Sequence, residues 1–284
     1  MFSKLFSYSP KSIAIKVKPV VERIVRKAHP WIFEEAIVKQ SVDGKSGDLA
    51  IVYDQKKNKF LALGLYDPHS PIRIKLLQYH QPAKINKDWF QQKIEKSYQI
   101  RQSLLTTTDT NSYRLIHGEN DGLPSFIADI YADVLVVKLY AAIWLPYLKT
   151  ILPIFQSITD CKVIVLRLSR SLQNLTEELQ GLEDGQVLYG ELKKEEVIFR
   201  EHGLQFSANV VKGHKTGYFL DHRHNRLKVG KMAKNKKVLD VFAYAGGFSV
   251  HALGGGAIEV VSLDISKHAL EMAKKNVALN PRLN

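Results

Sequence analysis

The chain has 284 residues, which is enough for two or three domains at roughly 100 to 200 residues each. Hydrophobic residues make up 45% of the chain and charged residues 24%, which excludes a disordered protein because this apolar fraction can bury a core. The net charge of +13 favours a polyanionic partner, so we expect nucleic acid first and an anionic membrane surface second.

The chain has one cysteine, Cys161, which excludes an intramolecular disulfide framework and a cysteine-rich zinc site. We interpret it as a structural residue in a protein from a reducing compartment. The most apolar stretch, 134–148, contains Lys138 and Pro146 and is shorter than the roughly 20 residues of a membrane span. The first twenty residues have no apolar core of a secretory signal. We therefore expect a cytoplasmic protein that does not enter a membrane.

The first segment, residues 1–80, is basic, with 14 basic and 7 acidic side chains. It alternates β-rich runs with turn residues, which is typical of a small β-barrel or sandwich. We predict strands over residues 13–17, 48–53, 60–65 and 72–77.

The middle segment, residues 81–200, is almost neutral, with 14 basic and 15 acidic side chains. A polar linker over 81–87 is expected to lead into an amphipathic helix over 89–105. The rest predicts a mixed α/β domain, with strands over 134–140 and 163–168 and helical material over 144–155.

The last segment, residues 201–284, is basic again, with 13 basic and 6 acidic side chains. Its pattern is strand, helix, strand, helix, over residues 238–243, 248–253, 259–265 and 267–279. This alternation implies parallel strands in a doubly wound, Rossmann-like sheet.

The sequence VLDVFAYAGGFSV, residues 238–250, carries the strongest functional signal. A β-branched run ends in a glycine turn, Gly246 and Gly247, and opens a helix. Because glycine has no Cβ, a ligand can approach the backbone there, close to the helix N-terminus. Asp264 closes the next strand, where a carboxylate can accept hydrogen bonds from two ribose hydroxyls. The pattern therefore predicts a cofactor that carries a nucleoside.

Three interpretations of the glycine turn remain open at this point. A dinucleotide enzyme, nicotinamide- or flavin-dependent, would show G-x-G-x-x-G, and the run from Tyr244 to Phe248 departs from that pattern. The run matches the first motif of class I S-adenosylmethionine methyltransferases, which we favour. A purely structural glycine turn is the third interpretation.

The run KGHKTGYFLDHRHNR, residues 212–226, is too polar for a plain core element. Three further runs accompany it: YRLIHGENDGLP, REHGLQFSAN and KAHPWIFEEAI, at 113–124, 200–209 and 27–37. Together they resemble the PUA-domain-containing class I S-adenosylmethionine-dependent methyltransferases that modify C5 of cytosine in large-subunit ribosomal RNA. The resemblance covers the chain from about residue 14 to its end, in the family's order.

The resemblance implies S-adenosylmethionine as the cofactor, ribosomal RNA as the partner and no metal. The cofactor-binding residues that it implies are Phe242, Tyr244, Gly246, Gly247, Phe248, Asp264, Lys215, Thr216, Asp221 and Arg223. It also implies that the N-terminal PUA-like domain docks structured RNA, with Lys27, His29 and Trp31 as RNA-binding candidates. Core packing is the alternative role for Trp31, and we interpret the three histidines of the 212–226 run as solvated or RNA-facing rather than metal-binding.

We therefore divide the chain into a PUA-like RNA-binding domain, a linker helix with a middle α/β domain, and the N-terminal part of a methyltransferase domain, at 1–80, 81–200 and 201–284. The third part looks incomplete, because the family's sheet has seven strands and only one helix follows Asp264. The family's Pro-Pro motif and attacking cysteine are also missing, since all ten prolines are isolated, so we expect the catalytic residues beyond residue 284. An open sheet edge and an apolar face would then favour aggregation or a homodimer. The alternative to an enzyme is an RNA-binding fragment without catalytic activity.

Overall fold

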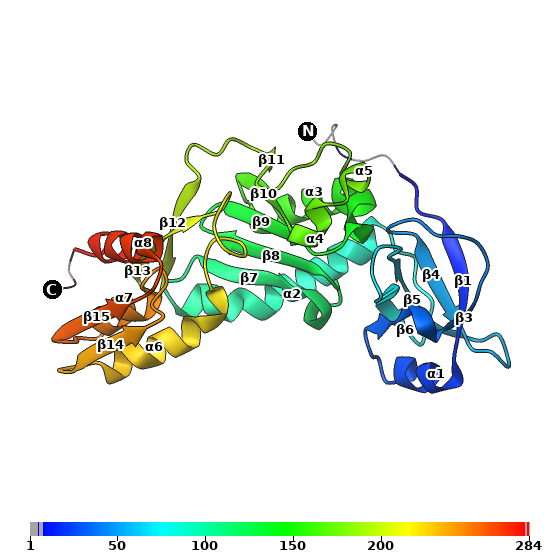
Figure 1. Cartoon of the computed structure of the whole chain (residues 1–284), viewed down its shortest axis with the longest axis horizontal. Helices are drawn as coiled ribbons and strands as arrows, with labels where there is room; N and C mark the ends of the chain where they lie inside the picture. The colour runs from blue at the N-terminus through cyan, green and yellow to red at the C-terminus, as the bar shows by residue number, and fades with distance from the viewer. Residues whose placement is uncertain (1–4, 6–7, 282, 284) are drawn as a thin grey trace. The chain divides into compact units, whose positions relative to one another are not determined.

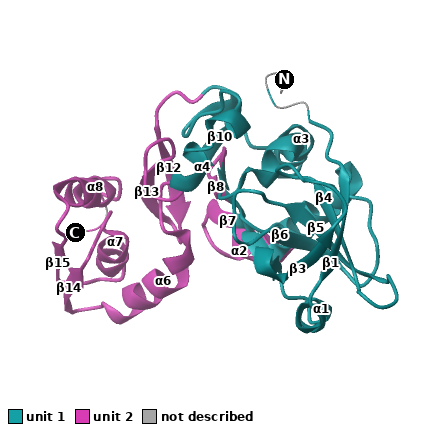
Figure 2. Ribbon diagram, turned by 45° about the vertical axis from the view of Figure 1, so that its right-hand side comes forward, with its two compact units in different colours: residues 1–99, 115–128, 137–191 teal, residues 100–114, 129–136, 192–284 magenta. Residues whose placement is uncertain are grey.

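A computed structural model of the chain describes residues 5, 8–281 and 283. The polypeptide forms two compact units (Figure 2), and each unit combines stretches that are far apart in the sequence. The first contains residues 1–99, 115–128 and 137–191, and the second contains residues 100–114, 129–136 and 192–284. Part of the stretch in which we expect no secretory signal, residues 1–4, 6 and 7, lies outside the described residues.

The first unit contains a curled six-stranded sheet (Figure 1) in the order β2-β6-β5-β4-β1-β3. Strand β1 pairs in parallel with β4 and antiparallel with β3. Every second residue of β1 is fully buried, as the two-residue period of a strand requires. The four strands predicted in this segment are confirmed to within two residues. The strands are β1 (Ser12–Val17), β2 (Trp31–Ile32), β3 (Ile37–Gln40), β4 (Leu49–Tyr53), β5 (Phe60–Tyr66) and β6 (Ile74–Tyr79).

The same segment contains a helix that the sequence pattern did not predict, α1 (Pro19–Arg26). Pro19 lies in its first turn, where the missing N–H has no intrahelical partner to lose. Only Val25 of this helix is buried, so the apolar stripe that would identify an amphipathic helix is narrow. A short 3-10 helix, η1 (Glu34–Ala36), follows β2.

A five-stranded sheet in the order β11-β10-β9-β8-β7 forms the middle of the chain. All six residues of β10 are buried, which is typical of a strand covered on both faces. The predicted mixed α/β character and both predicted strands are confirmed. The strands are β7 (Ser112–His117), β8 (Phe126–Tyr131), β9 (Val134–Leu139), β10 (Val163–Leu168) and β11 (Val187–Tyr189).

The helices of this middle region include α2 (Lys87–Thr107), which confirms the helix predicted after the linker. The material predicted as helical over 144–155 divides at Leu148 into a 3-10 turn and an α-helix. In the described part of the chain, no helix combines the length and the apolar character needed to cross a bilayer. The remaining elements are η2 (Gly118–Asp121), η3 (Ala142–Tyr147), α3 (Leu148–Thr159), α4 (Arg170–Gln173) and α5 (Thr176–Leu179).

The second unit contains a hairpin that the sequence analysis did not identify, formed by β12 (Glu196–Glu201) and β13 (Leu204–Asn209). Its two-residue turn, His202 and Gly203, has positive φ at both positions, 52° and 80°. Such a turn matches the twist of antiparallel strands. The hairpin places Glu201 at the end of β12, fully buried.

The end of the chain forms the predicted strand–helix–strand–helix unit. Strands β14 (Lys237–Val241) and β15 (Glu259–Leu263) are parallel, with Asp240 opposite Ser262. Helix α7 (Gly247–Gly254) connects them, and α8 (Lys267–Ala278) follows with Ser266 as its N-cap. Two elements that precede β14 were not predicted, η4 (Leu220–His222) and α6 (Arg223–Met232).

The two parallel strands have one covered face and one apolar face that is exposed. On the covered face, Val238 and Val260 pack with Ala252 of α7. The residues of the other face are between 45% and 103% exposed, namely Leu239, Val241, Val261, Leu263 and Ile265. The apolar face expected from the sequence is therefore present.

Candidate functional site

The loop between β14 and α7 is held in a conformation that costs energy. Phe242 and Tyr244 have φ of 62° and 48°, in the left-handed region that residues other than glycine rarely adopt. The backbone N–H of Tyr244 donates to Asp264 at 2.8 Å, and that of Ala243 donates to the Leu263 carbonyl at 3.0 Å. These bonds to the next strand hold the strained loop, and such strain is concentrated at binding and catalytic sites.

The two glycines of the turn are required by close packing within the protein. A Cβ on Gly246, whose φ is 70°, would lie 2.7 Å from the Cβ of Ala273 in α8. A Cβ on Gly247 would collide with the Tyr218 hydroxyl and lie 2.9 Å from the Cδ of Arg226. The sequence analysis explained these glycines by the close approach of a ligand. In the structure, side chains of the protein itself already occupy the space that a Cβ at either position would need.

A cavity of about 370 Å³ lies beside the turn, within the size range of small-molecule sites. Its walls are mostly aromatic, and the rings of Phe219 and Tyr244 meet edge to face at 5.2 Å. Such walls offer flat apolar surfaces to a nucleobase. The lining residues are His214, Tyr218, Phe219, His222, Arg226, Phe242, Ala243, Tyr244, Gly247 and Phe248.

Arg226, which lines the cavity, belongs to a buried cluster of charges with Glu201 and His251. We call this cluster the floor of the cavity. The Arg226 guanidinium donates to both carboxylate oxygens of Glu201, each at 2.7 Å, and His251 Nε2 bonds the same carboxylate at 3.0 Å. Burial by itself would raise the pKa of Glu201, but the hydrogen bonds from Arg226 and His251 lower it to about 2. Glu201 therefore stays ionised and holds Arg226 in place.

Tyr218 is the polar group of the wall whose hydrogen bonding is incomplete. Its ring lies under the Arg226 guanidinium, 4.7 Å from the centroid to Cζ, and its hydroxyl is buried. Among the residues that the structure describes, this hydroxyl has no hydrogen-bond partner. A buried hydroxyl without a partner is costly, so a polar ligand atom in the cavity would satisfy it.

Asp264 lies at the carboxyl end of β15 and reaches the glycine turn at the end of β14. One of its oxygens accepts from Tyr244 N, and the other accepts from Ser266 N at 2.9 Å. The hydrogen bonds from the backbone of Ser266 and of Tyr244 lower the pKa of Asp264, so the carboxylate is ionised. Each oxygen keeps a lone pair for a further donor, which suits a pair of ribose hydroxyls. The turn and the acid thus belong to the same end of the parallel strands.

The other predicted cofactor residues lie in different places. Of the predicted set, Phe242, Tyr244, Gly247 and Phe248 line the cavity, and Gly246 caps α7 behind it. None of the remaining residues is on the cavity wall. The Lys215 ammonium lies 4.6 Å from the centroid of Phe219, the Thr216 hydroxyl donates to Asp129, Asp221 is exposed in η4, and Arg223 begins α6, half-buried.

The sequence analysis missed several wall residues, namely His214, Phe219, His222 and Arg226. All of them belong to the polar run 212–226, which it singled out as a whole. The run folds as a loop, η4 and the first turn of α6 in succession. Neither a helical nor a strand periodicity applies to the whole run, so the sequence does not show which of its side chains face the glycine turn.

The RNA-binding candidates lie in the first unit, near a cavity of about 340 Å³. Lys27 is exposed at the C-cap of α1, while His29 and Trp31 line the cavity together with Phe33. The Trp31 indole N–H donates to Glu119 at 3.1 Å, which restrains the ring, and the residue is partly buried. Trp31 is therefore neither a fully buried core residue nor a mobile surface ring.

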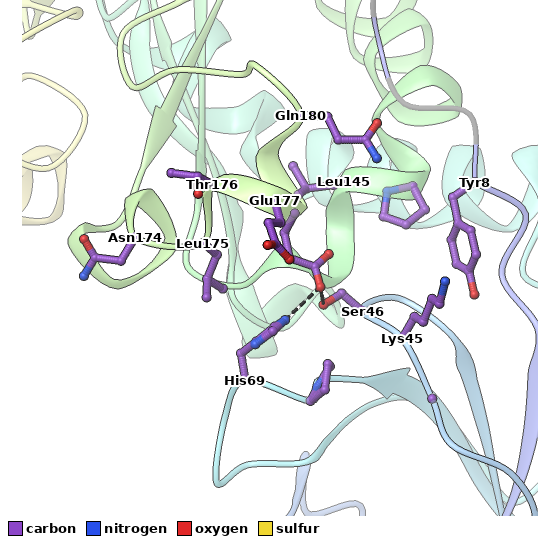
Figure 3. A pocket seen from close by; sticks show the side chains of 14 residues that line it. Tyr8, Lys45, Ser46, His69, Leu145, Asn174, Leu175, Thr176, Glu177 and Gln180 are labelled. Carbon is purple, nitrogen blue, oxygen red and sulfur yellow. Dashed lines mark hydrogen bonds and ion pairs between the residues drawn. The ribbon is translucent and has the colours of Figure 1, made fainter.

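A larger cavity of the first unit, about 620 Å³, contains no residue that the sequence analysis selected (Figure 3). Its polar centre is Glu178, which is bonded by His69 Nε2 at 2.7 Å and by the Ser46 hydroxyl at 3.0 Å. Across the described residues, no group of three or more His, Cys, Asp or Glu side chains is placed to hold a metal ion.

Cys161 is buried, and burial raises the pKa of its thiol.

Family profiles match both parts of the chain. A profile of PUA-like domains matches residues 15–79, and a profile of S-adenosylmethionine-dependent methyltransferases matches residues 113–283. A ribosomal RNA large subunit methyltransferase from Deinococcus radiodurans is 44% identical over 280 residues, 97% of this chain and 68% of the relative. Ribosomal RNA large subunit methyltransferase I from Pseudoalteromonas atlantica is 35% identical over 278 residues, 95% of this chain and 67% of that protein.

Solved structures have the same fold. A Streptococcus mutans protein assigned as a SAM-dependent methyltransferase superposes with a TM-score of 0.79 at 20% identity, covering 94% of this chain and 67% of the other. A second, solved in complex with SAH, gives 0.79 at 19% identity, covering 95% and 67%. The chain belongs to the S-adenosylmethionine-dependent methyltransferase family, with a PUA-like domain before the methyltransferase part. It spans 67% to 68% of the length of these two curated relatives.

Proposed function

We propose that this chain binds S-adenosylmethionine in the cavity beside the glycine turn and contributes that site to an RNA methyltransferase. The observation that carries the proposal is a cavity with aromatic walls and the buried Tyr218 hydroxyl, whose lining residue Tyr244 donates its backbone N–H to the ionised Asp264. When bound, the cofactor supplies an electrophilic methyl group on its sulfonium. Binding and orientation of that group are the tasks of the residues in the cavity.

The roles of these residues follow from their chemistry. Asp264 accepts hydrogen bonds from the ribose hydroxyls, and the aromatic side chains of Phe219 and Phe248 offer flat surfaces to the adenine. The first turn of α7, which begins at Gly247, presents backbone N–H groups to the cofactor's carboxylate. Lys215, Thr216, Asp221 and Arg223 support the loop that borders the cavity rather than lining it.

We propose ribosomal RNA as the partner of the chain. The support is the net charge of +13, the names of the relatives, and the cavity that His29 and Trp31 line beside the exposed Lys27. Phosphate neutralisation by lysine and arginine would supply most of the affinity, and the partly exposed Trp31 ring can stack on an unpaired base. In this assignment residues 1–80 bind RNA, residues 81–200 connect, and residues 201–284 bind the cofactor.

We further propose C5 of a cytosine in large-subunit ribosomal RNA as the methyl acceptor. The support is the resemblance of the 212–226 run to enzymes with that specificity. Their reaction uses a cysteine thiolate that attacks C6 of the base. Cys161 does not suit this role because it is buried and burial disfavours its thiolate. No residue of this chain is therefore assigned to the attack.

The single buried cysteine also supports a second candidate function, an RNA-binding chain that carries out no methyl transfer. The two are separated by incubating the chain with ribosomal RNA and S-adenosylmethionine labelled on its methyl group. Label in the RNA supports the enzyme. RNA binding without label, together with cofactor binding, supports the second candidate.

The test of the cofactor site is calorimetric titration of SAH into wild type and Tyr218→Phe. We expect wild type to bind, and the variant to bind about fivefold to tenfold more weakly because one hydrogen bond to the ligand is lost. The variant should unfold at the same or a higher temperature without ligand, because it removes an unsatisfied buried hydroxyl. Absence of heat with wild type would refute the proposed site.

We also propose that the exposed apolar face of β14 and β15 promotes self-association of the isolated chain, as a homodimer or larger species. Apolar side chains that are 45% or more exposed on one sheet face are a recognised association hazard. Sedimentation velocity should show a species above the monomer mass of 32.2 kDa. Leu239→Lys with Val261→Lys should shift the population toward monomer.

A further inference from the structure

The second unit contains an ion pair between Arg114 and Asp129, which lie on two strands of the five-stranded sheet. The Arg114 guanidinium, from β7, donates to both oxygens of Asp129, from β8, at 2.9 and 3.0 Å. Asp129 is completely buried. A buried carboxylate needs all its hydrogen-bonding capacity satisfied, and the ion pair leaves part of that capacity for a third group.

The third group is the hydroxyl of Thr216, in the loop that leads to the wall residues Tyr218 and Phe219. The Thr216 hydroxyl donates its proton to Asp129 at 2.6 Å, so its oxygen accepts from the Tyr131 hydroxyl, 3.0 Å away. Tyr131 in turn accepts from the backbone N–H of Tyr218 at 3.1 Å, and its hydroxyl lies 3.2 Å from the Tyr218 carbonyl. A continuous chain of hydrogen bonds thus connects the ion pair to the backbone of the cavity wall.

The loop needs such support because its backbone is strained. Lys215 has φ of 54°, and Gly217 has φ of 134°. A Cβ on Gly217 would lie 3.1 Å from the Ala208 Cβ, so the loop also lies close against β13. Strained conformations persist only where surrounding contacts hold them. Tyr218 and Phe219, the next two residues, are on the cavity wall, so the position of this segment sets the shape of the wall.

We propose that Arg114, Asp129 and Tyr131 are positioning residues for the cofactor cavity. They act through Thr216 and the Tyr218 backbone and touch no ligand themselves. If the network is broken, the loop samples other conformations, and the apparent affinity for a ligand falls in proportion to the fraction that remains competent. The inference rests on the proposed cofactor site and extends it to residues that lie outside the cavity.

The experiment compares SAH affinity and thermal unfolding of wild type, Tyr131→Phe, Thr216→Val and Thr216→Ser. Tyr131→Phe removes only the hydroxyl, and Thr216→Val replaces the hydroxyl by a methyl group of similar size. We expect each of these two variants to bind SAH about tenfold more weakly, the effect of one lost buried hydrogen bond if it is transmitted fully to the loop. Thr216→Ser keeps the donor to Asp129 and should bind within about twofold of wild type.

Tyr147→Phe is the matched control. Tyr147 lies in the first unit, and its buried hydroxyl donates a hydrogen bond to the backbone carbonyl of Gly47 at 2.8 Å. Its loss should lower the unfolding temperature as Tyr131→Phe does and leave SAH affinity unchanged. Amide hydrogen exchange without ligand adds an independent measurement, because the Tyr218 N–H should exchange faster in Tyr131→Phe and at the wild-type rate in Tyr147→Phe.

The outcomes separate the two claims. If wild type fails to bind SAH, the proposed function is wrong and the positioning role falls with it. If wild type binds and Tyr131→Phe and Thr216→Val bind equally well, the network stabilises the fold only, and the positioning role alone is wrong. A loss of affinity in Tyr147→Phe as large as that in Tyr131→Phe would also refute it, since the effect would then follow global stability.

Discussion

The floor and the rim of the cavity hold their carboxylates in opposite ways. On the floor, Glu201 is fully buried and both of its oxygens accept from protein side chains, Arg226 and His251. At the rim, the donors to Asp264 among the described residues are two backbone N–H groups, and its side chain is partly exposed. The floor carboxylate is saturated by the fold, whereas the rim carboxylate keeps acceptor capacity for a ligand. Substitutions on the floor should therefore affect stability, and those at the rim should affect binding.

The largest expected effect is on the floor, in Glu201→Gln. The substitution keeps the shape of the side chain but leaves the Arg226 guanidinium buried without a counter-charge. Removing one partner of a buried ion pair costs about 3 to 5 kcal/mol, to be measured as the free energy of unfolding in urea. Glu195→Gln is the control, because Glu195 pairs with Lys212 at 2.6 Å on the exposed surface and its substitution should change the free energy of unfolding little. Equal losses in the two variants would show that burial of the Glu201 ion pair does not make it more important for stability than an exposed pair.

The pH dependence of stability tests the same carboxylate without a mutation. Because the folded pKa of Glu201 is lowered to about 2 from its ordinary value of 4.5, its contribution is fully present above pH 4.5. The contribution is lost as the pH falls toward about 2, and the shift corresponds to roughly 3 kcal/mol. Unfolding free energies measured across this window should fall more steeply in wild type than in Glu201→Gln. Parallel curves would show that Glu201 is not the group responsible.

The strand–helix–strand–helix unit at the end of the chain, β14 to α8, could be predicted from the sequence because its signals are local. A β-branched run, two glycines and a second strand follow one another within about thirty residues, so pattern and fold agree. The β12–β13 hairpin lacked such a signal. Its turn, His202 and Gly203, is one of several short glycine-containing segments in the chain, and only the backbone conformation distinguishes it.

The site was predictable only where its residues are close in sequence. Asp264 and the glycine turn were found because their spacing is typical of a nucleoside site. The floor was missed because Arg226 and His251 lie 25 and 50 positions from Glu201 along the chain. The hydrogen bond of Thr216 could not be predicted for the same reason, since its partner, Asp129, lies 87 positions away in a strand. Contacts of that separation leave no periodic pattern in one sequence.

At the rim, Asp264→Ala should reduce SAH affinity about tenfold or more, because two hydrogen bonds to the ribose are lost. The ligand-free protein should also lose some stability, because the backbone N–H groups of Tyr244 and Ser266 lose their acceptor. Asp54→Ala is the matched control. Its carboxylate also accepts two backbone N–H bonds, from Lys57 and Lys59, in the first unit. Calorimetry with SAH should distinguish the two, and equal affinity in Asp264→Ala and Asp54→Ala would remove Asp264 from the site.

The smallest effect is expected at Lys215, which is exposed and whose ammonium lies 4.6 Å from the centroid of the Phe219 ring on the cavity wall. Exposed cation–π contacts contribute about 0.5 to 1 kcal/mol, so Lys215→Met should weaken SAH binding roughly twofold to fivefold by leaving Phe219 less restrained. Lys215→Arg keeps a cation over the ring and should bind as wild type does. A loss as large as that in Asp264→Ala would mean that Lys215 contacts the ligand directly, and the rim would then extend to the 212–226 loop.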